Sequence, residues 1–189
     1  MKTPHPRSVY LLLLPAMLLL VGCSAEQPAT ADTDTPELIV AAERGDTLRI
    51  ETLLAAHDPV DSRDSCQWTP LMKAALNGHS QAADRLIRAG AGLDLADKGG
   101  YTALMLAASN NHAELVKSLL AQGANPNLQE STKGWTALIW AAKQGHLESV
   151  AALIEGGATI GITDFAGETA RSWAGKNHHL EVIRLLDNS

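Results

Sequence analysis

Aromatic residues are scarce in this sequence. Phe, Trp and Tyr make up only 4% of its 189 residues, although 46% are hydrophobic. Most of the apolar positions are Ala or Leu, so a folded core must be built from small and aliphatic side chains. With 19% of charged residues, the composition excludes a disordered chain and a polytopic membrane protein, and the length favours a single soluble domain.

Positive charge is also in short supply. The chain has 15 Lys and Arg against 21 Asp and Glu, a net charge of -6, and no basic patch of the kind that binds nucleic acid. It lacks a nucleophile elbow, a phosphate-binding loop and a metalloprotease Glu/His motif. Acids such as Asp94 and Asp97 fall in predicted loops, where we expect solvated side chains and not a catalytic dyad. We therefore predict a protein that is not an enzyme and has no small-molecule substrate.

The N-terminal segment differs from the rest of the chain. Lys2 and Arg7 precede an apolar run that is too short for a membrane-spanning helix and is typical of an export signal. The run ends in Leu-Val-Gly-Cys at residues 20–23, which resembles the lipobox of bacterial lipoproteins. The resemblance implies that residues 1–22 are a signal peptide and that Cys23 becomes lipidated. A soluble exported protein and an uncleaved anchor, each with a chance cysteine, are the alternatives.

Residues 23–35 are predicted to be the lipidated cysteine and a flexible tether, because this stretch is small, polar and aperiodic. Two or three acyl chains hold a protein on a bilayer, whereas one chain does not. Ser24 follows the cysteine where an Asp would imply retention on the inner membrane, so the resemblance implies the periplasmic side of the outer membrane. Loss of Lys2 and Arg7 with the signal makes the mature chain more acidic still.

Internal repeats organise the remainder. A seven-residue block that begins with Thr recurs at spacings of 33 and 34 residues, and a block that begins with Pro36 fits the same frame. Five units therefore fill one domain, residues 36–189. The blocks begin at Pro36, Thr69, Thr102, Thr136 and Thr169, and the units span about 36–68, 69–101, 102–135, 136–168 and 169–189.

Each unit carries two helical signals. Thr caps a short apolar helix, with Thr35 in this role in the first unit, and a second amphipathic helix such as 112–120 follows. Paired alanines allow the first helices of neighbouring units to approach closely. We predict an all-α solenoid of helix-turn-helix units joined by projecting loops. The first helices should end near a left-handed residue, at Gly45, Gly78, Asn111, Gly145 and His178.

These units resemble the ankyrin repeat. The resemblance rests on the Thr-x-Leu-x-x-Ala-Ala block, the Gly-His step and the Gly-Ala-x-x-Asn/Asp exit, and it covers the chain after the tether. It implies a non-catalytic scaffold that binds proteins. One extra residue between Gln129 and Gly134 predicts a longer loop tip there. The sequence departs from the family where a His follows Thr-Pro-Leu, since Met72, Met105, Ile139 and Ser172 stand at that position.

Four histidines recur at one repeat position. Equivalent residues of stacked units lie roughly 8 to 10 Å apart, too far for one zinc ion to collect them. We therefore expect turn-stabilising histidines and no metal site, and we expect no cofactor beyond the lipid on Cys23. The adjacent pair His178 and His179 also lacks a ligand frame. The four are His79, His112, His146 and His179.

Cys66 is the only cysteine in the predicted domain. It falls at a predicted loop tip, where a tolerated loop cysteine is the favoured interpretation. In an oxidising compartment a lone exposed thiol would instead form a mixed disulfide or report on redox state, and that alternative remains open.

The few aromatic residues fall at two repeat positions. Trp68, Tyr101 and Trp135 precede the capping Thr, and Trp140 and Trp173 lie five residues further on. In the ankyrin pattern both positions face the concave surface, so we predict exposed rings that bind a protein. Rings that only cover the loop stems are the alternative. Predicted contacts beside them are Leu76, Asn77, Ser109, Asn110, Lys143 and Gln144, with Lys98, Phe165 and Glu168 at or beside loop tips.

We predict a monomeric, lipid-anchored periplasmic protein that binds an unidentified protein partner. It resembles exported bacterial ankyrin proteins linked to periplasmic catalase activity, which implies an accessory role in oxidative-stress defence. The alternative is an immunity protein that neutralises a basic toxin delivered to the periplasm, which the acidic charge would suit.

Overall fold

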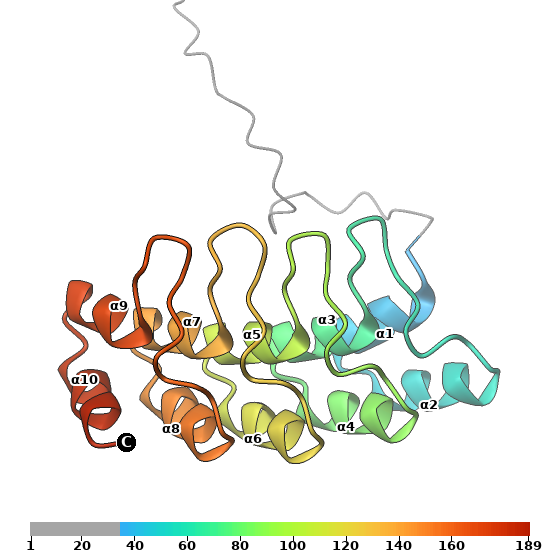
Figure 1. Ribbon diagram of the computed structural model, residues 1–189. Helices are drawn as coiled ribbons and strands as arrows, with labels where there is room; N and C mark the ends of the chain where they lie inside the picture. The colour runs from blue at the N-terminus through green and yellow to red at the C-terminus, as the bar shows by residue number, and fades with distance from the viewer. Residues whose placement is uncertain (1–34) are drawn as a thin grey trace, which may run out of the picture.

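The computed structural model describes residues 35–189, which form a row of helix pairs (Figure 1). The predicted signal peptide, Cys23 and nearly all of the tether lie outside the described residues. Every regular element in the described part is an α-helix, as the sequence predicts. The helices are α1 (Glu37–Arg44), α2 (Thr47–Ala55), α3 (Pro70–Asn77), α4 (Ser80–Arg88), α5 (Ala103–Ser109), α6 (Ala113–Ala121), α7 (Ala137–Gln144), α8 (Leu147–Glu155), α9 (Ala170–Lys176) and α10 (Leu180–Asp187).

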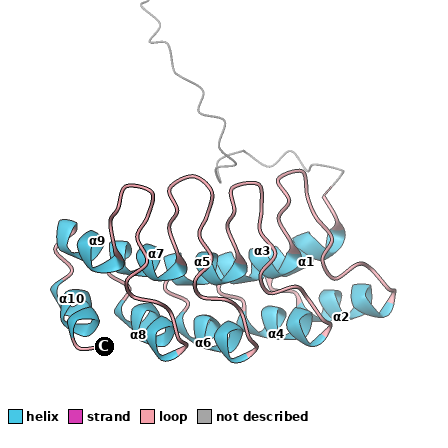
Figure 2. Ribbon diagram, in the orientation of Figure 1, coloured by secondary structure: helices cyan, strands magenta, loops and turns pink. Residues whose placement is uncertain are grey.

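The helices form two layers. The odd-numbered helices pack against one another in chain order, α1 on α3 and so on to α9, and the even-numbered helices form the second row. Four loops, residues 56–69, 89–102, 122–136 and 156–169, connect the pairs and project together beyond the odd-numbered row (Figure 2). The loops therefore stand side by side along one edge of the stack.

Small side chains allow the odd-numbered helices to pack closely. Ala74, Ala75, Ala141 and Ala142 have no solvent exposure, and leucines such as Leu71 fill the space between layers. Four of the five predicted threonine caps are present. Thr69, for example, accepts a hydrogen bond from the backbone N–H of Met72 at 3.2 Å. The prediction of a Thr35 cap is wrong, because Pro36 occupies the N-cap position of α1 and no side chain caps that helix.

The recurring histidines join each unit to the one before it. The ring Nε2 of His79 donates to the backbone carbonyl of Glu43 at 3.1 Å. The rings of His112, His146 and His179 make the same bond to Leu76, Ser109 and Lys143. A Cβ on Gly45 would lie 2.8 Å from the His79 ring, so the left-handed glycine at the end of α1 also makes room for it. The expectation of turn-stabilising histidines is confirmed.

Backbone hydrogen bonds also link the tips of neighbouring loops. The N–H of Lys98 donates to the carbonyl of Cys66 at 3.2 Å, and the N–H of Ser131 donates to Gly99 at 2.9 Å. The N–H of Phe165 donates to Lys133 at 2.9 Å. The four loops therefore form one continuous surface, although no loop contains a strand.

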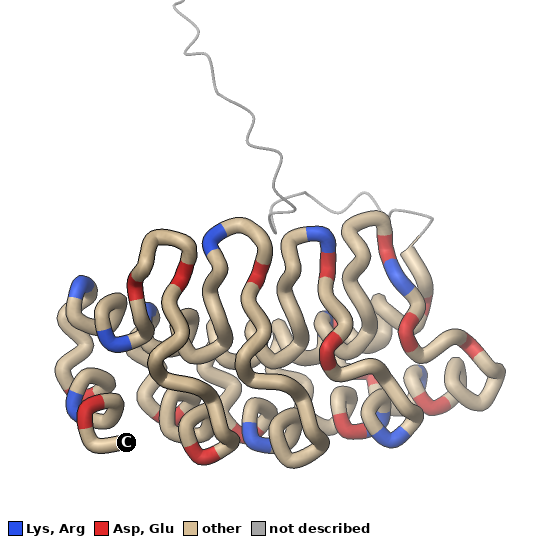
Figure 3. The backbone as a smooth tube through the Cα atoms, viewed as in Figure 1, with Lys and Arg blue, Asp and Glu red and all other residues tan. Residues whose placement is uncertain are grey.

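Charged residues are spread over both layers (Figure 3). Acidic positions recur on the sides of the loops, and basic positions lie at the tips of two neighbouring loops. Within residues 35–189, no helix is both long enough and apolar enough to cross a bilayer.

Candidate functional site

Each loop is organised by an acidic side chain at an equivalent position. Asp64 Oδ1 accepts hydrogen bonds from the N–H groups of Cys66 and Trp68, and Asp97 binds the second loop in the same way. The sequence interpretation of Asp97 as a merely solvated loop acid is therefore wrong. The signal that would have found this role is the recurrence of an acid five residues before the capping Thr, or six residues before it in the third loop, which has one residue more. The four acids are Asp64, Asp97, Glu130 and Asp164.

The third loop contains the predicted extra residue and uses a longer acid to accommodate it. Glu130 replaces Asp and is fully buried. Its carboxylate accepts hydrogen bonds from the N–H groups of Thr132 and Lys133, each at 2.7 Å, and from Trp135 at 3.1 Å. Burial alone would raise the pKa of Glu130, but these bonds and that from the Thr132 hydroxyl outweigh it and lower the pKa.

Four aromatic side chains, one from each of four successive units, form one cluster. The ring centroids of Trp135 and Trp140 are 4.6 Å apart, and those of Trp135 and Trp173 are 5.2 Å apart, both in edge-to-face geometry. Tyr101 packs against Trp140 at 5.9 Å. We call Tyr101, Trp135, Trp140 and Trp173 the aromatic cluster. Trp68, the fifth predicted aromatic contact, lies apart from it under Lys73, whose Nζ is 4.9 Å from the ring centroid.

Asp164 holds two rings of this cluster in place. Its Oδ2 accepts hydrogen bonds from the indole N–H groups of Trp135 at 2.9 Å and Trp173 at 2.8 Å. Its Oδ1 accepts from the backbone of Ala166 and Glu168, as the acids of the other loops do. Asp164 is only 5% exposed, and burial by itself would raise its pKa. The hydrogen bonds outweigh this effect and lower the pKa, so the buried carboxylate is ionised at neutral pH.

Trp135 is not an exposed contact residue, contrary to the sequence prediction. Only 3% of its surface is accessible. The ring is buried because the fourth loop closes over it and supplies Asp164, while Trp140 and Trp173 pack on its edges. Tyr101, Trp140, Trp173 and Trp68 are half-buried. For Trp135, the structure therefore agrees with the alternative prediction, in which the ring covers the loop stems.

Three lysines lie on the faces of these tryptophans. The Nζ of Lys133 is 4.3 Å from the Trp135 centroid, and that of Lys143 is 5.3 Å from Trp135 and 5.9 Å from Trp173. Lys176 lies 4.8 Å from Trp173 and also pairs with Glu168 at 2.7 Å. Lys133 and Lys143 form no ion pair with any carboxylate of the described residues. Their charge is thus balanced only by the aromatic rings and solvent.

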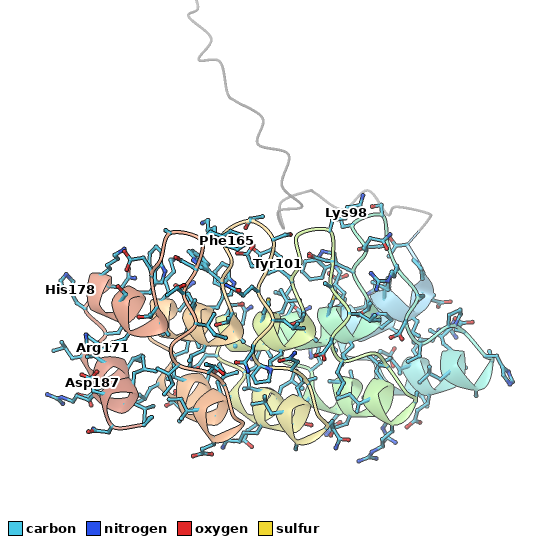
Figure 4. All side chains as sticks on the ribbon, viewed as in Figure 1. Lys98, Tyr101, Phe165, Arg171, His178 and Asp187 are labelled. Atoms are coloured by element: carbon cyan, nitrogen blue, oxygen red, sulfur yellow. The ribbon has the colours of Figure 1, made fainter. Side chains whose placement is uncertain are left out.

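The three tryptophans of the cluster line a pocket of about 560 Å³, and Tyr101 does not reach it. Phe165 lies at its edge, where it is 68% exposed, and its ring packs over Gly134, which has no Cβ to exclude it. Figure 4 shows Phe165 at the projecting end of the loops, with Tyr101 nearer to the helices. We call this the aromatic pocket. It is lined by Thr132, Lys133, Trp135, Trp140, Lys143, Asp164, Phe165, Ala166 and Trp173.

Several of the other predicted contact residues form hydrogen bonds to backbone carbonyls of their own helix. The Asn77 amide donates to the carbonyl of Lys73, and the Asn110 amide and Ser109 hydroxyl donate to the carbonyl of Leu106. These residues, the half-buried Leu76 and the exposed Gln144 do not line the aromatic pocket. Of the predicted contacts beside the rings, only Lys143 lines it.

The remaining polar groups give no sign of a catalytic or metal centre. No group of three or more His, Cys, Asp or Glu side chains in residues 35–189 is arranged to hold a metal ion. The histidine rings are engaged by the backbone carbonyls of preceding units. Cys66 is half-buried in the first loop, where its backbone carbonyl accepts a hydrogen bond from the N–H of Lys98.

Comparison with known families agrees with the architecture. A family model described as ankyrin repeats (3 copies) matches residues 38–130 and again residues 104–189, most of the chain. The chain therefore belongs to the ankyrin-repeat family. Such repeats are typically non-catalytic modules for protein–protein interaction, which indicates a protein partner. No curated protein matches the chain.

Proposed function

We propose that this protein is a scaffold that captures a protein partner through the concave face of its repeats, with the aromatic pocket as the main contact. The observation that carries the proposal is Phe165. It is an exposed ring beside a pocket lined by tryptophans, in a chain whose core is mostly Ala and Leu. Clustered aromatic residues with lysines around them are typical of the energetically important centre of a binding surface.

The test is capture of the native partner by purified full-length protein and by two variants. Phe165→Ala removes the exposed ring of the pocket, and Leu180→Ala removes an apolar side chain that is 62% exposed on α10 and does not line the pocket. We expect the first variant to retain about tenfold less of the partner, a loss of about 1.4 kcal/mol, and the second to retain it fully. If both folded variants retained the partner equally well, the pocket would not be part of the interface.

We further propose that the protein works from a membrane, through a lipid on Cys23. The lipobox-like residues 20–23 support this, and the residues from Ser24 to Thr35 are long enough to hold the domain away from the bilayer, since an extended chain of that length reaches roughly 40 Å. Cys23→Ser should move the protein from the membrane fraction to the soluble fraction. Cys66→Ser, the matched cysteine change in the domain, should leave it with the membranes.

The biological role that we propose is support of periplasmic oxidative-stress defence, through the resemblance to exported ankyrin proteins linked to catalase. Deletion of the gene should lower survival in peroxide, and Phe165→Ala should reproduce the defect while Leu180→Ala should not. Equal survival with and without the gene would contradict this role. The acidic surplus of the chain favours one alternative, an immunity protein against a basic periplasmic toxin; under that role deletion would sensitise cells to the toxin and not to peroxide.

A further inference from the structure

We infer that the aromatic pocket binds a segment of the partner in which an apolar side chain, preferably aromatic, is flanked by carboxylates. The inference rests on the proposed function and names the chemistry that this face recognises. Its apolar half follows from the lining, where Trp140, Trp173 and Phe165 surround a pocket large enough for one large side chain.

The preference for carboxylates in the ligand follows from which charged groups of the protein are accessible around the pocket. The one carboxylate in the pocket lining, Asp164, is 5% exposed and accepts four N–H donors of the protein itself. Glu168, beside the pocket, is half-buried and paired with Lys176. Lys133 is exposed and Lys143 is half-buried, and neither has a carboxylate partner. The pocket lining therefore presents two ammonium groups without a carboxylate partner, and its one carboxylate is buried, although the chain as a whole is acidic.

The two lysines are placed to act together. Both Nζ atoms lie over the Trp135 ring, at 4.3 and 5.3 Å from its centroid. A carboxylate beside an inserted side chain can approach both ammonium groups from the side away from the ring, so the cation–π contacts need not be given up. Because these lysines lie at the surface, we expect the attraction to weaken as salt is added.

One further group lacks a partner. The indole N–H of Trp140 is buried and has no acceptor in the structure. Asp164 accepts a hydrogen bond from the indole of Trp135 and from that of Trp173, whereas no hydrogen bond fixes the Trp140 ring. A small tilt of this ring on binding would offer its N–H to a carboxylate or carbonyl oxygen of the ligand, which would remove an unsatisfied donor.

A cation is the wrong ligand for this pocket, despite its tryptophans. The faces of Trp135 and Trp173 already carry the protein's own lysines. Asp164, the carboxylate that would otherwise attract a cation, is occupied by four donors. The pocket therefore differs from the aromatic cages that bind quaternary ammonium groups, whose ring faces are vacant.

The experiment uses three N-acetylated, C-amidated pentapeptides and the tryptophan fluorescence of the full-length protein. The central three residues are Asp-Phe-Asp in the probe, Lys-Phe-Lys in the charge control and Asp-Ala-Asp in the apolar control, each flanked by glycine. At low salt we expect the probe to bind at least about tenfold more tightly than either control, with a dissociation constant near or below about 1 mM. A basic peptide that binds equally well, or no saturation by the probe at about tenfold that concentration, would overturn the inference.

Lysine variants test whether Lys133 and Lys143 cause the preference for the acidic peptide. Lys133→Gln combined with Lys143→Gln should weaken probe binding about tenfold, whereas Lys98→Gln should leave it unchanged, since Lys98 is an exposed loop-tip lysine outside the pocket lining. Urea unfolding of each variant checks that it is folded. Unchanged probe binding in the folded double variant would contradict the assignment of the lysines.

The outcomes separate this inference from the proposed function. Partner capture that depends on Phe165, without any preference for the acidic peptide, would reject the acidic recognition and keep the binding face. A clear preference for the acidic peptide, with partner capture that is indifferent to Phe165→Ala, would keep the pocket chemistry and reject the pocket as the site of the proposed function.

Discussion

The first two loops and the last two loops share one turn design but differ in what they enclose. Asp64 and Asp97 order the first two loops by hydrogen bonds to backbone N–H groups, as Glu130 and Asp164 order the last two. Beside the first loop, Trp68 packs alone against Lys73. Beside the last two, three tryptophans pack together over a buried carboxylate.

The difference arises from a second repeat position. Five residues after the position of Trp68 and its equivalents, the second and third units have Lys73 and Leu106, whereas the fourth and fifth have Trp140 and Trp173. Trp135, at the first position, meets Trp140 and Trp173, which occupy the second position of two adjacent units, and these rings surround the Asp164 carboxylate. The chemistry of the aromatic pocket is therefore a property of neighbouring units in combination and not of any single repeat.

The largest expected effect is a loss of stability when Trp135 is removed, compared with the loss when Trp68 is removed from the equivalent repeat position. Trp135→Ala should lower the free energy of unfolding by about 3–5 kcal/mol, because it empties a buried site and removes a partner of Asp164. Trp68→Ala, at the equivalent but half-buried position, should cost about 1–2 kcal/mol. Urea unfolding followed by circular dichroism measures both, and equal losses would show that the cluster adds no stability.

The next largest effect is the loss of stability on removing the acid of the fourth loop, compared with removing the acid of the first loop. Asp164→Ala leaves two indole N–H groups and two backbone N–H groups without their acceptor, so we expect a loss of about 3 kcal/mol. Asp64→Ala affects backbone donors of a half-buried loop only and should cost about 1 kcal/mol. The same unfolding experiment applies. A larger loss for Asp64 than for Asp164 would contradict the bridging role of the buried carboxylate.

A smaller effect is expected from the length of the third acid. Glu130→Asp retracts the carboxylate by one methylene from a loop that has one residue more than its neighbours, and should cost about 1 kcal/mol. Deleting Thr132 in that variant restores the spacing of the other loops, so we expect it to recover part of the lost stability. Deletion in the unchanged protein is the control, and it should destabilise.

The smallest expected difference is one of pH dependence, and it appears in acid, where Asp164 loses its charge. Since the folded-state pKa of Asp164 lies below its ordinary value, its contribution to stability is present above the unfolded-state pKa, about 3.9, and is lost as the pH falls through the folded-state value. Asp164→Asn should therefore show a shallower decline in unfolding free energy below about pH 4 than the unchanged protein. Parallel declines would assign acid sensitivity to other carboxylates.

The fold was predictable because its signals are local and repeated. Thr69 and its equivalents mark helix starts, glycines mark helix ends, and the spacing between histidines and glycines recurs in register. The burial of Trp135 was not predictable, because it depends on Asp164, which is 29 residues away and belongs to another loop. An acid in a loop carries no sign in the sequence that two indoles will bind it. The exposed Phe165 was recognised only as a loop-tip residue for the same reason.

The histidine contacts have a consequence for the length of the stack. Each ring donates to a carbonyl of the preceding unit, and the rings of His79, His112 and His179 also lie over the glycine that ends the first helix of that unit. Removal or insertion of one whole period inside the array brings the same pair of groups together again at the new junction. The array can thus lengthen or shorten without inventing a contact, and each added period on the N-terminal side would carry the aromatic pocket roughly 8 to 10 Å further from the start of the domain. Repeat number therefore sets the reach of the pocket.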